Sequence, residues 1–497
     1  MTEKYWSVRD PISAERLLWR AQAVRHTFHL LPGETILELA CGSGRLTRSL
    51  RKVTRGECPI TAATFGFGAD DGVKELKRDV EVVALDSFPG DLRGRTFDYI
   101  VANNLLDLHN TAWLLKEVQR LLRPGGRLLF FETNPWNPMF QLRRIAAKCV
   151  PFAFHERALP SQVHLYELMS ELGFVRIATT CYDFLYPPIP GWCMRVARNL
   201  SLVLENTPGV RNMAGTILVH AQRPPCDVPR PDVRMVEHTS LNDAISVVVP
   251  CHNEEMNAGS LVAGLLQHYD EYIHQIVLVD DNSTDGTRQV LEALAATDGR
   301  IRPVIRTPPG GVGLALRDGM RAATGKYILI MDCDFLQILP ELRQMFDSAA
   351  EGFDVVLGSR FSRASVLINY PIQKILFNRT FHLLASLLFR RRLRDLTNNL
   401  KLLKREVADN LNLESFLFAA NAETGLKPLL MGYSMDPVPI SWINRTSDMG
   451  QSSFSLLTNG WGYTKVLASL AWSTRCGRRP LARPSEASKS LGDRRNE

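Results

Sequence analysis

The chain lacks several features that define other classes of protein. No apolar run among its 497 residues approaches the roughly 18–20 residues that a membrane-spanning helix needs. Its nine cysteines include no Cys-x-x-Cys pair, and an odd count without a disulfide framework indicates a reducing compartment. The net charge of +7 is spread along the chain without a basic stripe, so we expect no nucleic-acid partner. The first residues, Met1 to Trp6, have no signal-peptide core, which predicts a protein that is cytoplasmic or peripheral at the inner face of a membrane.

The composition fits two α/β domains in series. An apolar content of 45% suffices for two cores. A proline-dense stretch from Arg223 to Pro231 is typical of a stiff linker, and the residues beyond Thr474 are rich in Arg, Ser and Pro with little to bury. We therefore expect a first domain over residues 1–223, a proline-rich linker over 224–243, a second domain over 244–472 and a disordered basic tail over 473–497.

Two carboxylates follow a short buried strand in the second domain. The run 327–331 is apolar and leads directly into Asp332-Cys333-Asp334. Side chains two apart on an extended chain point the same way, and open α/β sheets bind ligands at the carboxyl ends of their strands. The pair suits a divalent cation, Mg²⁺ or Mn²⁺, that also holds a substrate diphosphate. An isolated motif of this kind is more often two solvated loop acids, so the segments that precede it decide the interpretation.

Two further strands with polar ends precede this one. The run 245–250 is closed by Cys251 to Glu255, and the run 275–279 leads into Asp280 to Thr287. Apolar runs that alternate with helical segments predict βαβ units and a parallel sheet. The polar groups of all three strand ends should therefore lie at one edge, where they could hold a base, a ribose and a diphosphate.

With the later segments 311–315, 358–360, 395–401 and 439–445 in the same order, residues 244–458 resemble the family 2 glycosyltransferases of GT-A fold. The likeness is greatest to the dolichol-phosphate mannosyltransferase and polyprenol-phosphate glycosyltransferase branch. The resemblance implies inversion at the anomeric carbon, metal binding by Asp332 and Asp334, and a catalytic centre that also includes Arg360 and Arg445. It implies nucleotide-sugar binding by Pro250, Asn253, Glu254 and Asp281. One departure is Leu336, where related proteins often have Gln; here Gln337 comes next.

The sugar acceptor decides the mechanism. A lipid phosphate carries an anionic oxygen that needs no protein base, so positioning and cation stabilisation of the leaving diphosphate would suffice. A glycan hydroxyl would need a carboxylate base, for which Asp395 and Glu423 are candidates. The sequence leaves both acceptors open.

The amino-terminal half carries a different loop. A strand over 35–39 leads into Ala40-Cys41-Gly42-Ser43-Gly44, and a helix begins at Arg45. Small residues let the backbone pass close to a ligand, and a helix start offers free N–H groups, although two glycines could also make a simple tight turn. Further strands follow over 81–86 and 97–102, then a helix over 113–122 and a strand over 127–131.

In this order, the Glu38-x-x-x-Gly42-x-Gly44 signature, Asp86 and the run Leu122 to Leu128 make residues 15–222 resemble a class I S-adenosylmethionine-dependent methyltransferase. The expected fold is thus a Rossmann-like methyltransferase domain followed by a GT-A domain. The resemblance implies that Glu38 orients the methionine part of S-adenosylmethionine, that Gly42 and Gly44 permit close approach, and that Asp86 meets the adenine. The family usually ends its second strand with an acid for the ribose, but here Gly66-Phe67-Gly68 follows, and Asp70 or Asp71 could substitute. A catalytically silent cofactor-binding or scaffolding module therefore remains the alternative.

The methyl acceptor is less defined. Asn103, Asn104, His109 and the run Glu132 to Trp136 lie at or after strand ends that should face the cofactor. His109 could take the acceptor's proton, or it could be a surface residue.

Membrane contact is suggested by one segment. Apolar residues between Ile372 and Leu388 fall near helical spacing, and Arg390-Arg391-Arg392-Leu393-Arg394 follows. This pattern fits an interfacial helix on anionic lipid, and it fits equally a core helix with a solvated basic end.

Together these features predict a bifunctional transferase. Its second domain would move a sugar from a nucleotide sugar to a polyprenyl-phosphate-type lipid, or alternatively to a glycan hydroxyl. Its first domain would methylate a component of the same glycan or glycolipid pathway.

Overall fold

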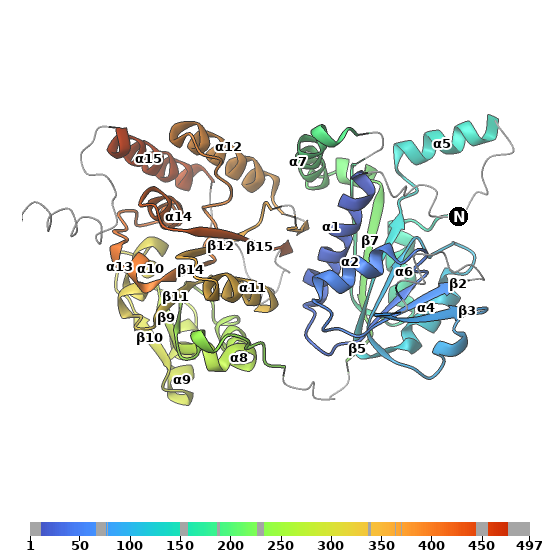
Figure 1. The fold of residues 1–497 in the computed structure, drawn as a ribbon, viewed down its shortest axis with the longest axis horizontal. Helices are drawn as coiled ribbons and strands as arrows, with labels where there is room; N and C mark the ends of the chain where they lie inside the picture. Colours follow the sequence, from blue (N-terminus) through green and yellow to red (C-terminus); the bar gives the residue numbers. More distant parts are fainter. Residues whose placement is uncertain are drawn as a thin grey trace, which may run out of the picture. The chain divides into compact units, whose positions relative to one another are not determined.

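The computed structural model describes residues 11–65, 76, 78–149, 158–185, 189–225, 233–335, 339–362, 364–368, 370–443 and 456–475. Several expectations fall outside these residues: the amino-terminal start, the loop 66–68 with Asp70 and Asp71, linker residues 226–232, Leu336 and Gln337, Arg445, and tail residues 476–497. The chain forms two compact units, Met1–Pro231 with Val366–Ile372, and Asp232–Ser365 with Gln373–Glu497 (Figure 1).

The first unit is built on a seven-stranded sheet in the order β3-β2-β1-β4-β5-β7-β6. Its strands are parallel except for β7, which pairs antiparallel with both β5 and β6. The central strand β1 is buried at every position, as a strand covered on both faces should be. The elements are α1 (Pro11–Phe28), β1 (Ile36–Leu39), α2 (Arg45–Val53), β2 (Ile60–Phe65), β3 (Glu81–Leu85), η2 (Gly90–Leu92), β4 (Phe97–Asn103), α4 (Thr111–Leu121), β5 (Leu122–Thr133), α5 (Pro138–Cys149), α6 (Gln162–Glu171), β6 (Val175–Tyr182), η3 (Gly191–Cys193), α7 (Met194–Glu205), η4 (Val210–Met213) and β7 (Thr216–Gln222).

The second unit is built on another seven-stranded sheet, in the order β10-β9-β8-β11-β14-β12-β15. Strands β10, β9, β8 and β11 are parallel, and the antiparallel β14 lies between β11 and β12. The elements are η5 (Thr239–Leu241), β8 (Ile245–Cys251), α8 (Ala258–Tyr269), η6 (Asp270–Tyr272), β9 (Ile273–Asp280), α9 (Thr287–Thr297), β10 (Ile301–Ile305), α10 (Val312–Ala322), β11 (Tyr327–Ile330), α11 (Leu339–Ala350), β12 (Val355–Ser359), β13 (Leu367–Ile368), α12 (Ile372–Phe389), β14 (Lys401–Lys404), α13 (Arg405–Asn410), α14 (Ala420–Leu430), β15 (Met435–Pro439), β16 (Trp442–Ile443) and α15 (Leu456–Arg475). The expectation of two layered α/β domains with largely parallel sheets is confirmed.

Residues expected to belong to the linker pack on the second unit. The Met235 amide donates to the His268 carbonyl at 2.8 Å. The Tyr272 hydroxyl accepts hydrogen bonds from the amides of Glu237 and His238 at 2.6 and 2.5 Å. The described end of the expected linker is thus fixed before β8 begins.

Helix α12 has both a buried and an exposed apolar side. Ile375, Phe381 and Ala385 are buried, and the Phe381 ring lies 5.5 Å from the ring of Tyr463 on α15. Leu383 and Leu387, in contrast, are 61% and 67% exposed. The helix therefore packs into the core along one side and leaves leucines uncovered on the other. Among the described helices, none combines the length and apolar character needed to cross a membrane.

Candidate functional site

The carboxyl ends of β8, β9 and β11 meet at one edge of the second sheet. These strands are parallel neighbours, so the segments that follow them start side by side. Pro250 lies near the end of β8, Asp281 follows β9, and Asp332 and Asp334 follow β11. The fold therefore brings the motifs expected for nucleotide sugar and cation to the same edge.

Asp332 is held by a residue from the antiparallel strand. The register pairs Ile330 with Lys401, and because β14 runs the opposite way, Asn399 comes to lie opposite Asp332. The Asn399 amide nitrogen donates to Asp332 Oδ1, while no described residue donates to Asn399 Oδ1 although that atom is buried. Asp332 is half-buried and Asp334 is 9% exposed. Two carboxylates in this setting are suited to a hard divalent cation, which would neutralise the negative charge of a leaving diphosphate.

The loops after β8 and β9 are tied together by hydrogen bonds. Asn253 has a left-handed backbone (φ 59°), and its Oδ1 accepts from the Thr284 amide at 2.8 Å. The Glu254 amide donates to Thr287 Oγ1 at 2.8 Å, and the Glu254 carboxylate accepts from the Asn257 side chain at 2.5 Å. Asn253 and Glu254 thus fix the loops after β8 and β9 to each other.

Asp281 is largely committed to contacts within the protein. Its carboxylate forms an ion pair with Arg306 and accepts from the Gly311 amide at 2.7 Å. Arg306 also binds Asp318 at 2.8 Å. Asp281 therefore anchors the segment 306–311 beside the site. Arg306 was not singled out from the sequence, since nothing in its local pattern indicates a partner 25 residues away.

Arg360 and Asp395 form a buried bidentate pair. Arg360 Nη2 lies 2.7 Å from Asp395 Oδ1 and its Nε lies 3.1 Å from Oδ2, while the Arg360 backbone amide donates to Oδ2 at 2.6 Å. Asn378 donates to Oδ1 at 2.9 Å. Burial by itself would raise the pKa of Asp395, but the charge and hydrogen bonds of Arg360 outweigh it and lower that pKa. The Asp395 carboxylate is therefore ionised and fully occupied by donors from the protein.

Glu423 is engaged in the same way. It accepts hydrogen bonds from the amides of Glu414 and Ser415 at 2.9 and 2.7 Å, and it lies 2.7 Å from Lys427 Nζ. The side chain of Glu423 is 3% exposed. Glu423 thus fixes the turn 414–415 onto α14.

Lys401 on β14 has a fully buried side-chain amine. Its Nζ donates to the Asn421 carbonyl at 2.7 Å and to Thr424 Oγ1 at 2.6 Å. Burial lowers the pKa of Lys401 to about 7, although the nearby charges of Asp395 and Asp332 oppose that shift. Lys401 ties β14 to α14, and the sequence motif that contains it did not reveal this role.

The glycine loop of the first unit adopts backbone angles that favour glycine. It follows β1 and precedes α2, and both Gly42 and Gly44 have positive φ, 53° and 70°. A Cβ on Gly44 would lie 1.7 Å from Leu76 Cδ1. Glu38, on β1, is buried and accepts a hydrogen bond from Thr47 Oγ1 at 2.6 Å. Burial raises the pKa of Glu38 to about 8, with the Thr47 hydrogen bond opposing.

At the other strand ends of the first unit, some candidate residues are exposed and others are hydrogen-bonded within the protein. Asp86 follows β3 and is exposed, and His109 is exposed as well. Glu132 instead accepts from the amides of Leu105 and Leu106 at 3.0 and 3.3 Å.

The asparagines at these strand ends form hydrogen bonds that connect neighbouring segments at the same edge of the sheet. The Asn104 side chain accepts from Thr133 at 2.9 Å, and Asn103 accepts from the buried Arg20. Asn134 donates to the Ala214 carbonyl at 2.7 Å. Glu132 and Asn134 therefore hold this edge of the sheet together through hydrogen bonds, while Asp86 is exposed to solvent.

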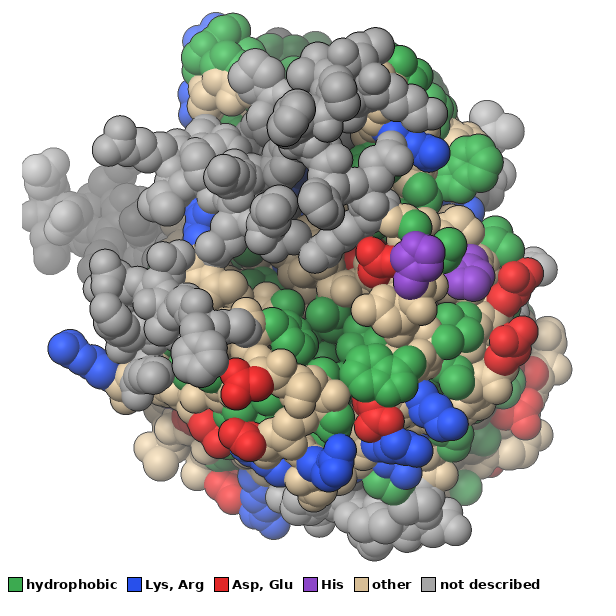
Figure 2. Space-filling view, turned by 90° about the vertical axis from the view of Figure 1, so that its right-hand side faces the viewer, with side chains coloured by type: hydrophobic (Ala, Val, Ile, Leu, Met, Phe, Trp, Pro, Cys, Tyr) green, Lys and Arg blue, Asp and Glu red, His purple; other side chains and the backbone are tan. Residues whose placement is uncertain are grey.

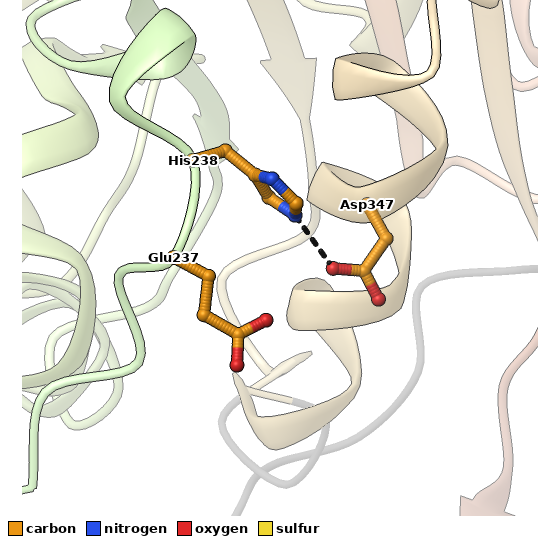
Figure 3. Close-up of side chains that lie close together, drawn as sticks. All are labelled: Glu237, His238 and Asp347. Carbon is orange, nitrogen blue, oxygen red and sulfur yellow. Dashed lines mark hydrogen bonds and ion pairs between the residues drawn. The ribbon is translucent and has the colours of Figure 1, made fainter.

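A separate group of metal-ligand side chains lies outside these edges (Figure 3). Glu237 and His238 precede β8, and Asp347 is on α11; His238 Nε2 lies 2.8 Å from Asp347 Oδ1. Glu237 forms an ion pair with Arg343. The contacts of this group fasten residues 237–238 to α11.

Comparison with known proteins supports the division into two transferase domains. The family model "Glycosyl transferase family 2" matches residues 246–411, and the model "Methyltransferase domain" matches residues 37–130. The polyprenol monophosphomannose synthase of Mycolicibacterium smegmatis is 28% identical over 216 residues, which are 42% of this chain and 80% of the relative. The dolichyl-phosphate hexose transferase of Haloferax volcanii is 27% identical over 221 residues, which are 44% of this chain and 91% of the relative.

Among solved structures, glucosyl-3-phosphoglycerate synthase from Mycobacterium tuberculosis aligns with 20% identity and a TM-score of 0.37, covering 50% of this chain and 86% of that one. A SAM-dependent methyltransferase from Thermotoga maritima, described as a possible histamine N-methyltransferase, aligns with 16% identity and a TM-score of 0.30, covering 42% and 90%. The family resemblances drawn from the sequence motifs are confirmed by the two family models.

Proposed function

We propose that this chain, which joins a methyltransferase domain to a family 2 glycosyl transferase domain, transfers a sugar from a nucleotide sugar to a polyprenyl-phosphate-type lipid. Transfer proceeds with inversion and uses Mg²⁺ or Mn²⁺ held by Asp332 and Asp334. The first domain binds S-adenosylmethionine and methylates a component of the same glycan or glycolipid pathway.

This proposal rests on the observation that both candidate bases, Asp395 and Glu423, already accept hydrogen bonds from other residues of the protein. Asp395 accepts four hydrogen bonds from Arg360 and Asn378, and Glu423 is held by two amides and Lys427. A general base must be free to take a proton from its acceptor. Because neither carboxylate is free, an acceptor that already carries a negative oxygen is favoured over a glycan hydroxyl. The names of the two relatives, a polyprenol monophosphomannose synthase and a dolichyl-phosphate hexose transferase, support the same acceptor class.

In the proposed reaction the phosphate oxygen of the lipid attacks the anomeric carbon as the bond to the nucleoside diphosphate breaks. Asp332 and Asp334 would hold the divalent cation, which would supply positive charge to the departing diphosphate. Asn399 positions Asp332 for this task. Arg360, oriented by Asp395, presents its cationic charge near the phosphates.

A lipid acceptor calls for contact with a membrane surface, and the second unit offers one. The exposed leucines of α12 lie on a helix that packs against α15, where Trp461 and Trp472 are 68% and 69% exposed. The basic run beginning at Arg390 follows α12 directly. An apolar face beside a basic cluster fits peripheral binding to anionic lipid.

The acceptor class can be tested with matched pairs. Purified protein is given a panel of nucleotide sugars with Mg²⁺, Mn²⁺ or EDTA, and either a short-chain polyprenyl phosphate or the corresponding polyprenol. We expect metal-dependent product with the phosphate only. Equal turnover of the polyprenol, or of a free sugar, would assign the domain to hydroxyl glycosylation.

A further inference from the structure

Two helical insertions in the first unit begin at the edge of the sheet where the glycine loop lies. The segment from Trp136 through α5 follows β5, and η3 with α7 follows β6. Both strands run parallel to β1, so their carboxyl ends share the edge of the glycine loop. Figure 1 shows α5 and α7 at the same end of this unit.

Both insertions expose large apolar side chains. On the first, Trp136, Leu142 and Ile145 are 71%, 60% and 61% exposed. On the second, Trp192 in η3 is 84% exposed, and Val196 and Leu200 on α7 are 69% and 57% exposed. The four-residue spacing of Val196 and Leu200 places them on one side of α7. Single exposed apolar residues are common on proteins, but aligned sets of this kind mark interaction surfaces.

The charged residues nearest to these side chains in the sequence are basic. Arg144 on α5 and Arg195 on α7 are exposed. Neither α5 nor the stretch 189–204 contains an acidic residue. The face seen from the right-hand side of Figure 1 carries apolar, basic and acidic side chains next to one another (Figure 2).

We propose that α5 and α7 form a lipid-docking face, and that the methyl acceptor of the first domain is a lipid carried in an anionic bilayer. Apolar helix sides bordered by arginines, with tryptophan among the most exposed residues, match the chemistry of the membrane–water interface. Because the insertions border the cofactor edge, a bilayer bound there would bring lipid headgroups to the methyl donor. The second part of this inference rests on the proposed methyltransferase activity; the docking face does not.

The chemistry requires no further cofactor. A nucleophilic heteroatom of the lipid headgroup bonds to the methyl carbon as the S–CH₃ bond of S-adenosylmethionine breaks. S-adenosylhomocysteine leaves, and the proton of the acceptor atom passes to solvent.

Docking is tested on the full chain with flotation on phosphatidylglycerol-containing vesicles. The variant Trp192→Ser/Val196→Ser/Leu200→Ser removes the α7 side, and Val175→Ser, at the opposite, amino end of β6, is the control. We expect the triple variant to bind the vesicles about tenfold more weakly, because it lacks the large apolar side chains that would insert into the bilayer. The control should bind like the unaltered chain. Unchanged binding of the triple variant would overturn the docking face.

Hydrogen exchange on the unaltered chain gives a second test that does not depend on a variant's folding. Vesicles should protect peptides covering α5 and α7. Protection confined to α12 and α15, or protection that requires an added protein and not lipid, would contradict the proposal.

The acceptor class is tested with methyl-labelled S-adenosylmethionine and either lipid vesicles or an aqueous extract. Label should enter the organic phase; label found only in water-soluble or protein material would refute a lipid acceptor. If no extract is methylated, the methyltransferase proposal fails, and the flotation result still decides the docking face. Sugar transfer to a water-soluble, short-chain polyprenyl phosphate should be unaffected in the triple variant, which separates this test from that of the glycosyl transferase.

Discussion

Replacing Asp395 with asparagine tests whether the Asp395 carboxylate has a structural role or acts as the catalytic base. The change keeps the shape of the side chain but removes its negative charge. In the structure that charge lies beside the Arg360 guanidinium, with the Asp395 side chain fully buried and that of Arg360 14% exposed. The variant would therefore leave a mostly buried guanidinium without its counter-ion, together with donors that an amide cannot all satisfy.

The expected cost follows from that arrangement. Removing one partner of a buried, hydrogen-bonded ion pair destabilises a protein by about 3–5 kcal/mol. In a domain of this size each kcal/mol shifts the melting temperature by roughly 2–4 °C. We therefore expect Asp395→Asn to lower the unfolding temperature of the second unit by roughly 6–20 °C, measured by scanning calorimetry. Asp409→Asn, at an exposed position on α13, serves as a control and should change it little.

The pH dependence of stability gives a second test of the role of Asp395. The pKa of Asp395 is lowered in the folded chain, so its contribution to stability is present above the ordinary carboxyl range and is lost as pH falls through the lowered pKa. The difference in melting temperature between the unaltered chain and Asp395→Asn should shrink in acid.

Activity distinguishes the two roles. Below its melting temperature, Asp395→Asn should retain sugar transfer to lipid phosphate within about tenfold, the loss arising from a less well oriented Arg360. Removal of a general base typically costs about 10²–10⁴-fold in rate. A variant that melts normally but loses activity on that scale would refute the structural assignment and restore Asp395 as the base.

Three further predictions concern the cation and the cofactor loop. Asp334→Asn should abolish metal-dependent sugar transfer while S-adenosylmethionine binding, measured by calorimetry, stays intact; retained transfer would place the cation elsewhere. S-adenosylmethionine affinity should weaken as pH falls below about 8, by up to tenfold per unit, because Glu38 must lose its proton to meet the cationic methionine part. That dependence should vanish in Glu38→Gln, and an unchanged slope would assign it to another group. Gly44→Val should reduce cofactor affinity, because its φ of 70° disfavours a branched side chain and Leu76 occupies the space; unaltered binding would place the cofactor away from this loop.

The parts of the fold carried by local patterns were predictable. Apolar runs such as 245–250 and 327–331 became the central strands β8 and β11, because parallel strands buried on both faces must be apolar throughout. The Asp-x-Asp motif and the glycine loop could be placed at strand ends for the same reason. These positions follow from residues that are adjacent in the sequence.

The partners of the site residues were not predictable in the same way. Asn399 contacts Asp332 only because the antiparallel strand β14 is inserted between β11 and β12, a topology that no local pattern indicates. Asp395 was a candidate base on residue type alone. The contacts that occupy it come from residues 17 and 35 positions away in the chain. Long-range hydrogen bonds of this kind decide whether a carboxylate is free for chemistry.

The linkage in the product tests the central claim most directly. A sugar joined to a lipid phosphate is a glycosyl phosphodiester, which mild acid cleaves, whereas a glycan glycoside survives that treatment. We expect radiolabelled product from the purified protein, a nucleotide sugar, Mn²⁺ and a mixture of lipid phosphate and glycan acceptors to be lipid-soluble and acid-labile, with inverted anomeric configuration by NMR. An acid-stable, water-soluble glycoside as the product would contradict the account.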